Sequence, residues 1–212
     1  MFVRDTISQT MKALVNEISQ VLPAQWYLAG DTALALHIGH RASIDLDYFS
    51  TTKFLVEELK NQLAQLWSAR AVLITYEAPQ TLWYEVDGVQ VSFIYRRTPL
   101  LQPVYEENNW RLATLRDITV MKLLAICSRE EYKDYFDLAC LSQQTDVRSW
   151  VHWWEDAYPE QDITSWLMAL GNYDTVLEIP LHVTAEFTKL SVAPQLRTVC
   201  SELTAYVQSR LS

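Results

Sequence analysis

The chain has 212 residues, of which 50% are hydrophobic and 20% charged. This composition is enough for one large or two small folded domains and excludes a disordered protein. The 26 acidic residues outnumber the 17 basic ones, so the net charge is -9. A negative field opposes the approach of polyanions and excludes a protein that coats DNA regardless of sequence. Any contact with a nucleic acid therefore requires a local basic patch or a metal ion.

The cysteines and the lack of apolar runs predict a cytoplasmic protein. Cys127, Cys140 and Cys200 cannot all pair within one chain and do not have the spacing of a zinc site, which predicts reduced thiols. Residues 1–15 lack the apolar core of a signal peptide, and no apolar run is long enough to cross a membrane. We expect no membrane partner.

The first part of the chain alternates between helical and strand patterns. Apolar residues recur every three or four positions in the helical stretches and every second position in the strands. In chain order, the patterns predict a helix over 6–22, a strand over 26–29, a tight turn at Gly30, a helix over 33–38, a strand over 44–49, a helix over 53–67 and strands over 71–76, 81–86 and 89–95. Asp87-Gly88 is typical of a two-residue hairpin turn.

Beyond Pro99 and Pro103 the strand alternation gives way to amphipathic helical patterns. These cover residues 117–127, 130–142, 147–156, 163–170 and 194–211. The sequence therefore predicts an α+β protein, in which a mixed sheet with flanking helices is followed by an all-helical carboxy-terminal half. We place the two domains at residues 1–98 and 99–212.

Two acids stand two residues apart on the predicted strand over 44–49. On a strand, Asp45 and Asp47 project from one face while Ile44, Leu46 and Tyr48 share the other. Two carboxylates about 6 Å apart repel by roughly 2 to 3 kcal/mol at an effective dielectric constant of about 20, and a divalent cation between them reverses this repulsion. Mg²⁺ is the natural occupant because it prefers oxygen ligands. The alternative is a solvent-facing strand without a ligand.

The turn at Gly30 precedes these acids and opens a predicted helix. Backbone N–H groups at a helix start favour an anion, so a phosphate can lie beside a metal held by the next strand. The alternative is an ordinary tight turn. The segment from His37 to Arg41 either supplies positive charge to a phosphate or forms a polar loop.

A second group of charges lies in the helical half. Lys122 interrupts an apolar stretch, where its ammonium either reaches outward to solvent or points into a cleft and holds a triphosphate. Arg129, Lys133 and Asp137 follow at helical spacing. An exposed charged face with one Lys133–Asp137 ion pair explains them without a function.

Two segments resemble a known family. YLAGDTALALHIGHRASIDLDYFS, over residues 27–50, resembles the opening motif of the nucleotidyltransferases that include the AbiEii/AbiGii toxins, within the polymerase-β-like superfamily. LRDITVMKLLAICSREEYKDYFDLACL, over 115–141, is similar to the family's helical motifs in the same order and at similar spacing. No motif is readable after about residue 145.

The resemblance implies a nucleotidyltransferase-like fold and roles for individual residues. It assigns Asp45 and Asp47 as catalytic metal-binding acids, Gly30 and Thr32 as a phosphate-facing turn, Lys122 as a triphosphate contact and Asp134 as either the proton acceptor or the ligand of a second metal. Their charge makes Arg41 and Arg129 further candidate phosphate contacts. We expect Lys122 and Asp134 to be contributed by the helical half to a cleft between the domains.

The implied reaction is transfer of a nucleoside monophosphate from a nucleoside triphosphate, with Mg²⁺ or alternatively Mn²⁺ as cofactor. The acceptor is a hydroxyl of an RNA, tRNA among them, or of a protein. A cognate antitoxin protein is a further implied partner.

Two positions depart from the family pattern. Asp31 stands where relatives commonly have a second glycine, and its carboxylate either repels a nucleotide or caps the following helix. The wider superfamily usually places a third acid on a later strand, but here Gln90 and Ser92 occupy that alternation.

Two other functions are compatible with these residues. A nucleotidyltransferase fold with an impaired pocket can serve as a nucleotide-binding or protein-interaction module. The tryptophans of the carboxy-terminal helical part either form a surface for a protein partner or fill the hydrophobic core; they include Trp150, Trp153, Trp154 and Trp166. The spacing of the acids also describes aspartyl-phosphate hydrolases. Those enzymes require Thr or Val where Phe49 stands.

Overall fold

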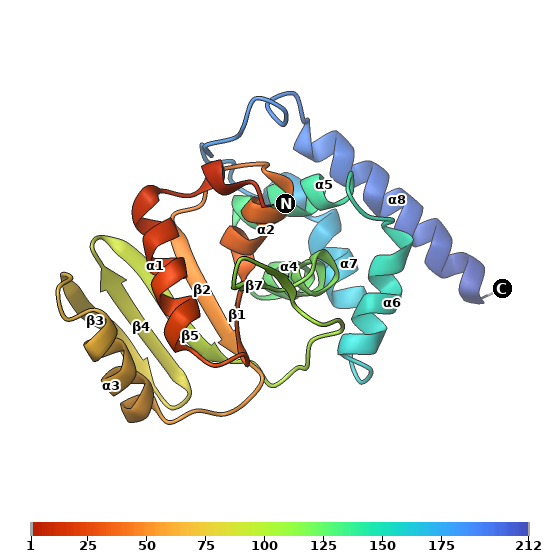
Figure 1. Cartoon of the computed structure of the whole chain (residues 1–212). Helices are drawn as coiled ribbons and strands as arrows, with labels where there is room; N and C mark the ends of the chain where they lie inside the picture. Colours follow the sequence, from red (N-terminus) through yellow and green to blue (C-terminus); the bar gives the residue numbers. More distant parts are fainter. Residues whose placement is uncertain (1, 212) are drawn as a thin grey trace. The chain divides into compact units, whose positions relative to one another are not determined.

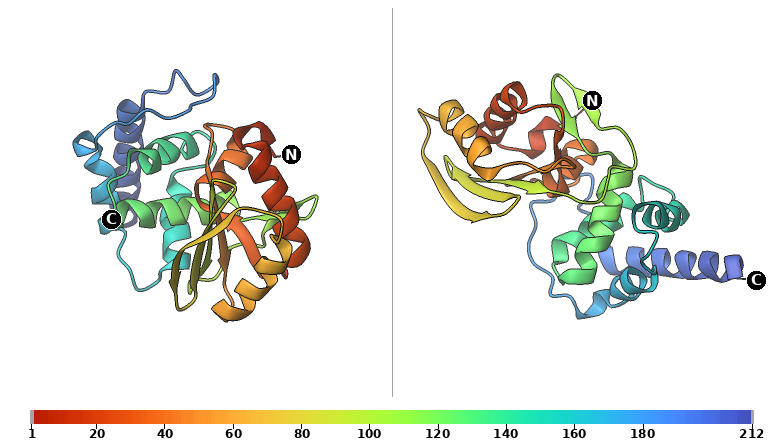
Figure 2. Two further views of the ribbon diagram at one scale, coloured as in Figure 1. Left: turned by 90° about the vertical axis from the view of Figure 1, so that its left-hand side faces the viewer. Right: turned by 90° about the horizontal axis from the view of Figure 1, so that it is seen from below.

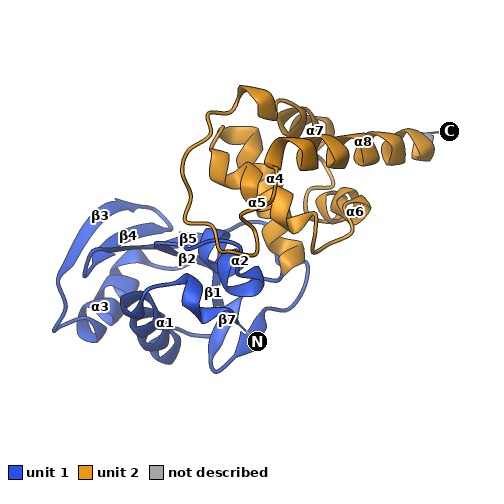
Figure 3. Ribbon diagram, turned by 90° about the horizontal axis from the view of Figure 1, so that it is seen from above, with its two compact units in different colours: residues 1–114 blue, residues 115–212 orange. Residues whose placement is uncertain are grey.

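The computed structural model describes residues 2–211, which fall into two compact units, residues 1–114 and 115–212 (Figure 3). The boundary after residue 98 predicted from the sequence is wrong, because the sheet of the first unit continues beyond it. Each unit has its own core. The mixed sheet of unit 1 and the helices of unit 2 confirm the predicted fold class.

Unit 1 is built on a seven-stranded mixed sheet with the order β3-β4-β5-β2-β1-β7-β6 (Figure 1). β2 lies near the middle, antiparallel to β1 and parallel to β5. Its position gives the acids on this strand neighbours on both sides. The strands are β1 Trp26–Ala29, β2 Asp45–Ser50, β3 Val72–Ala78, β4 Thr81–Val86, β5 Val89–Tyr95, β6 Tyr105–Glu107 and β7 Trp110–Leu112.

Two helices, α1 (Gln9–Val21) and α3 (Val56–Leu66), cover one face of the sheet (Figure 2, right; Figure 3). Their apolar stripes supply buried side chains, Leu14 and Ile18 from α1 and Leu59 and Leu63 from α3. On the sheet, buried and exposed residues alternate along β4 as expected for a strand with one covered face. Unit 1 also contains α2 (Gly30–Ile38) and the short helix η1 (Arg4–Thr6).

The sheet does not end before Pro99, and this part of the prediction is wrong. β6 and β7 form a hairpin whose turn residues, Asn108 and Asn109, have φ values of 52° and 66°. β7 pairs in parallel with β1 through Leu28 and Leu112 and thereby extends the sheet. Strands of three residues are too short to show a clear alternation, so only their pairing with β1 identifies them.

The described part of unit 2 is helical, as predicted. Its elements are α4 Leu115–Ser128, α5 Tyr132–Leu141, α6 Arg148–Ala157, α7 Thr164–Gly171, η2 Tyr173–Thr175 and α8 Val192–Leu211. Helix α4 packs against α5, α6 and α7. Trp150, Trp154 and Trp166 are completely buried, so these tryptophans fill the core of unit 2 and do not form a partner surface. None of the helices within residues 2–211 is both long and apolar enough to span a membrane.

Candidate active site

The two acids of β2 lie on one face of the strand, as the alternation predicts. Leu46 and Tyr48 are buried, whereas Asp45 and Asp47 are partly exposed on the opposite face. Ile44, which was expected to share a face with Leu46 and Tyr48, precedes the strand and is 73% exposed. The carboxylate pair is therefore accessible to solvent on a central strand.

Gly30 lies directly against the second acid. Strand β1 ends at Ala29, which pairs with Asp47, and Gly30 then turns the chain into α2 with a φ of 66°. A Cβ atom at Gly30 would lie 3.0 Å from Asp47 Oδ2. Glycine is therefore required both for the backbone conformation and for the close approach of the turn to the carboxylate.

A serine occupies the position where the wider superfamily has a third acid. In the register of β2 and β5, Gln90 lies beside Asp45 and Ser92 beside Asp47. The Ser92 hydroxyl donates a hydrogen bond of 2.6 Å to Asp47 Oδ1. Ser92 therefore orients the carboxylate, a role that the sequence gave no reason to assign.

Thr32 connects α2 to the start of β2. Its side chain is buried, with Oγ1 2.7 Å from Ser43 Oγ and donating to the carbonyl of Asp45. The hydroxyl thus holds the backbone of the first acid in place. The phosphate-facing role of the turn formed by Gly30 and Thr32 stays a prediction.

Asp31 forms an ion pair within unit 1. Its Oδ2 lies 3.1 Å from Arg41 Nη2, and both side chains are largely buried, with 14% and 5% of their surface exposed. Of the two alternatives for Asp31, the helix cap is wrong, because Ala29 occupies the N-cap position and Asp31 lies in the first turn of α2. The pair neutralises the negative charge beside the Gly30 turn.

The segment from His37 to Arg41 does not present free positive charge, contrary to one reading of its sequence. Burial lowers the pKa of His37, which favours the neutral ring, and the opposing effect is a hydrogen bond to the carbonyl of Ala113. His40 is buried, and the Arg41 guanidinium is paired with Asp31. The segment thus serves the packing of unit 1.

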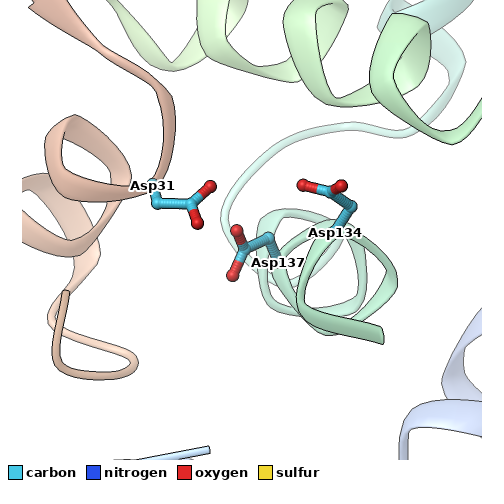
Figure 4. A group of neighbouring side chains, drawn as sticks. All are labelled: Asp31, Asp134 and Asp137. Atoms are coloured by element: carbon cyan, nitrogen blue, oxygen red, sulfur yellow. The ribbon is translucent and has the colours of Figure 1, made fainter. Parts of the chain in front are cut away.

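In unit 2, Lys122 is held between two carboxylates of α5. Its Nζ lies 2.8 Å from Asp134 Oδ1 and 2.6 Å from Asp137 Oδ2. The lysine side chain is 3% exposed and both aspartates are 0% exposed. Figure 4 draws the two aspartates, which project one turn apart from α5, and also labels Asp31 of α2. An outward-reaching lysine is therefore excluded.

Arg129 provides the second cation of this cluster. Its Nε lies 2.8 Å from Asp134 Oδ2, while its own side chain is 44% exposed. The predicted exposed face with a Lys133–Asp137 pair is wrong, because Asp137 is buried against Lys122, and Lys133 Nζ lies 3.2 Å from Glu131 Oε2. The i, i+3 spacing of Asp134 and Asp137 was the available signal, since such residues share a helix face.

A model of the nucleotidyl transferase AbiEii toxin family, described as a type IV toxin–antitoxin system, matches residues 12–157. The chain belongs to this family. The matched region contains β2 with its acids, the Gly30 turn, and the Lys122 cluster of α4 and α5. Helices α7 and α8 both lie entirely outside it, in the part of the chain where no motif is readable.

An uncharacterised protein of Aquifex aeolicus (strain VF5) is 33% identical over 140 residues, which cover 64% of this chain and 66% of that protein. The chain thus spans just under two thirds of the length of that relative.

Solved structures show the same fold. JHP933 from Helicobacter pylori is 21% identical with a TM-score of 0.56, covering 96% of this chain and 97% of that one. MenT4, a nucleotidyltransferase toxin from Mycobacterium tuberculosis H37Rv, is 14% identical with a TM-score of 0.62, covering 93% and 82%.

Proposed function

We propose that the protein transfers a nucleoside monophosphate from a nucleoside triphosphate to a hydroxyl of an RNA or protein, as the toxin of a toxin–antitoxin pair. The observation that carries the proposal is the placement of Asp45 and Asp47 on the open face of β2, with Gly30 against Asp47, in a chain of the AbiEii family. An antitoxin protein is the partner that such a family implies.

The residues of β2 fit a divalent metal. Asp45 and Asp47 offer accessible carboxylate oxygens from one strand face, and Ser92 fixes the orientation of Asp47. Hard oxygen donors of this kind suit Mg²⁺, with Mn²⁺ as an alternative. When bound, such an ion neutralises charge on the phosphates and on the leaving pyrophosphate.

The surroundings of the Gly30 turn are suited to an anion. Gly30 opens α2, and at a helix start the backbone N–H groups without intrahelical partners and the helix dipole favour negative charge. Asp31 is neutralised by Arg41, so its carboxylate does not repel a phosphate as a free acid would. This removes the main reason to consider the site impaired and weakens the non-enzymatic alternative. Membership of the AbiEii nucleotidyltransferase family disfavours the alternative function as an aspartyl-phosphate hydrolase.

Within unit 2, we propose that Lys122 and Arg129 contact the triphosphate and that Asp134 positions them. Both oxygens of Asp134 accept from these cations, Oδ1 from Lys122 and Oδ2 from Arg129. A carboxylate so engaged suits orientation of cations better than proton acceptance. Arg129 is the more accessible of the two, since 44% of its side chain is exposed.

Labelled nucleotides test the proposal. Purified protein is incubated with each labelled nucleoside triphosphate, Mg²⁺ and total cellular RNA, and the products are resolved by size. Label on RNA identifies an RNA acceptor, and label on protein a protein acceptor. Asp45→Asn should reduce labelling at least about 100-fold, because a metal ligand is lost.

A matched control replaces an acid far from the site. Glu106 lies exposed on β6, so Glu106→Gln should leave labelling unchanged. Absence of label with every nucleotide, or full labelling by a folded Asp45→Asn variant, would contradict the proposed function.

A further inference from the structure

The sheet face that carries the two acids also carries an exposed aromatic pair. Tyr76 of β3 and Trp83 of β4 have ring centroids 5.0 Å apart at an interplanar angle of 47°. Their exposed fractions are 48% and 42%. Trp83 is the one tryptophan among residues 2–211 that is exposed to this degree, whereas Trp67 nearby is buried.

The aromatic pair lies on the same row of the sheet as Asp47. Tyr76 pairs with Trp83, Trp83 with Ser92, and Ser92 with Asp47. Directly paired residues of neighbouring strands project from the same face, and adjacent strands lie about 4.8 Å apart. Trp83 is therefore about 10 Å and Tyr76 about 14 Å from Asp47 along the row, by the same strand spacing.

The Gly30 turn lies against the Asp47 end of this row, whereas the aromatic pair at its other end is exposed. Helices α1 and α3 lie on the other face (Figure 2, right; Figure 3), where Leu82 and Tyr84 of β4 are buried. Together with Leu73, the aromatic pair forms a group of neighbouring exposed apolar side chains on one face, and contiguous groups of this kind are typical of binding surfaces. The surface here is continuous with the proposed metal site.

We propose that Tyr76 and Trp83 stack on unpaired bases of a nucleic-acid acceptor strand whose reacting end lies at Asp47. This inference rests on the proposed function. Base–aromatic stacking is independent of sequence and requires a single strand, because paired bases do not expose their faces to a flat surface. Two rings on successive strands match successive bases, whereas a mononucleotide presents only one.

The charges around the pair indicate that bases, and not phosphates, supply the affinity. Glu85 lies exposed on the same face of β4, and its carboxylate accepts a hydrogen bond from Gln90. A net charge of -9 adds long-range repulsion of a polyanion, so a stacking site departs from the expectation that contact with a nucleic acid requires a basic patch or a metal ion. Removing the bases while retaining the sugar–phosphate backbone should therefore remove most of the binding.

Fluorescence anisotropy of a labelled single-stranded RNA of about 12 nucleotides tests the site directly, since single-strand sites span about 4 to 16 nucleotides. We expect Trp83→Ala to weaken binding about tenfold or more, as loss of one stacked base predicts. Trp83→Phe should retain binding within about threefold, because the ring is kept. An abasic oligonucleotide of equal length should bind weakly to every variant.

Leu73→Ala is the matched control, because Leu73 lies exposed on the same face, opposite Glu85, but has no ring. It should bind RNA like the unmodified protein. Urea unfolding of each variant confirms that the sheet is intact. RNA binding is measured without nucleotide or metal. A failure of RNA binding would therefore not count against the proposed nucleotide transfer. Transfer activity alone, in turn, would not support the stacking site.

Three results would overturn the stacking site. The first is equal binding by the Trp83→Ala variant and the unmodified protein, and the second is equal binding of the abasic and normal oligonucleotides. The third comes from sedimentation: a dimer of the unmodified protein that Trp83→Ala converts to monomer would make this face an interface between copies of the chain.

Discussion

Gly30 shows how one residue can set both a backbone turn and a carboxylate position. A left-handed conformation costs an ordinary residue about 1 to 2 kcal/mol, which explains a glycine at a φ of 66°. The close approach to Asp47 Oδ2 is a separate constraint that only the folded chain imposes. The two constraints can be separated by comparing two glycines.

Gly30→Ala and Gly88→Ala should have different effects on activity. Gly88 has a φ of 80° but open space around its Cβ position, so alanine there should cost only the conformational strain of about 1 kcal/mol. Alanine at Gly30 should add displacement of Asp47 and reduce nucleotide transfer strongly. Urea unfolding and the labelling assay measure the two effects, and equal activities of the variants would refute the role of Gly30.

Lys122 should be essential for the stability of unit 2. Lys122→Met leaves Asp137 buried with its charge uncompensated by Lys122, which typically costs about 3 to 5 kcal/mol. Adding Asp137→Asn removes that charge and should restore part of the lost stability. Urea unfolding of both variants measures this coupling. If Lys122→Met alone were as stable as the unmodified protein, the Lys122–Asp137 contact would contribute little to the free energy of unfolding.

The elements predicted most accurately are those whose side-chain pattern depends on one covered face. The alternation of β2, β4 and β5 and the Asp87-Gly88 turn are visible in the sequence because one face of each strand packs under α1 and α3. The hairpin of β6 and β7 was missed because each strand has only three residues, and the hairpin joins the sheet through a pairing distant in sequence, Leu112 with Leu28. The only local sequence signal of this hairpin is its turn, Asn108-Asn109, because asparagine adopts positive φ values more readily than most residues.

The turn of this hairpin should tolerate glycine better than alanine. Asn109 has a φ of 66°, so Asn109→Ala should lower the free energy of unfolding by about 1 kcal/mol, whereas Asn109→Gly should not, because Asn-Gly favours this turn. Asn172, with a φ of -86°, is the control, and Asn172→Ala should have a smaller effect. The midpoints of urea unfolding are compared for Asn109→Ala, Asn109→Gly and Asn172→Ala. Equal losses for the alanine and glycine variants of Asn109 would contradict this explanation.

The net charge of the whole molecule predicts an unusual salt dependence. Proteins that bind nucleic acid through 6 to 10 phosphate contacts lose about 10³ to 10⁵ in affinity between about 50 and 200 mM salt. With a charge of -9 and affinity from stacking, this protein should lose less than about tenfold over that range. Anisotropy titrations at two salt concentrations decide this, and a steep decline would indicate a basic binding patch instead.

The fold class, the shared face of Asp45 and Asp47, and the turn at Gly30 could be predicted from the sequence, because periodicity and turn chemistry are local properties. The partners of the charged residues became visible only in the folded chain. Arg41 with Asp31, and Lys122 with Asp134 and Asp137, are pairs made by burial. A buried charge must find a counter-charge, but the sequence does not show which charges will be buried or which will meet.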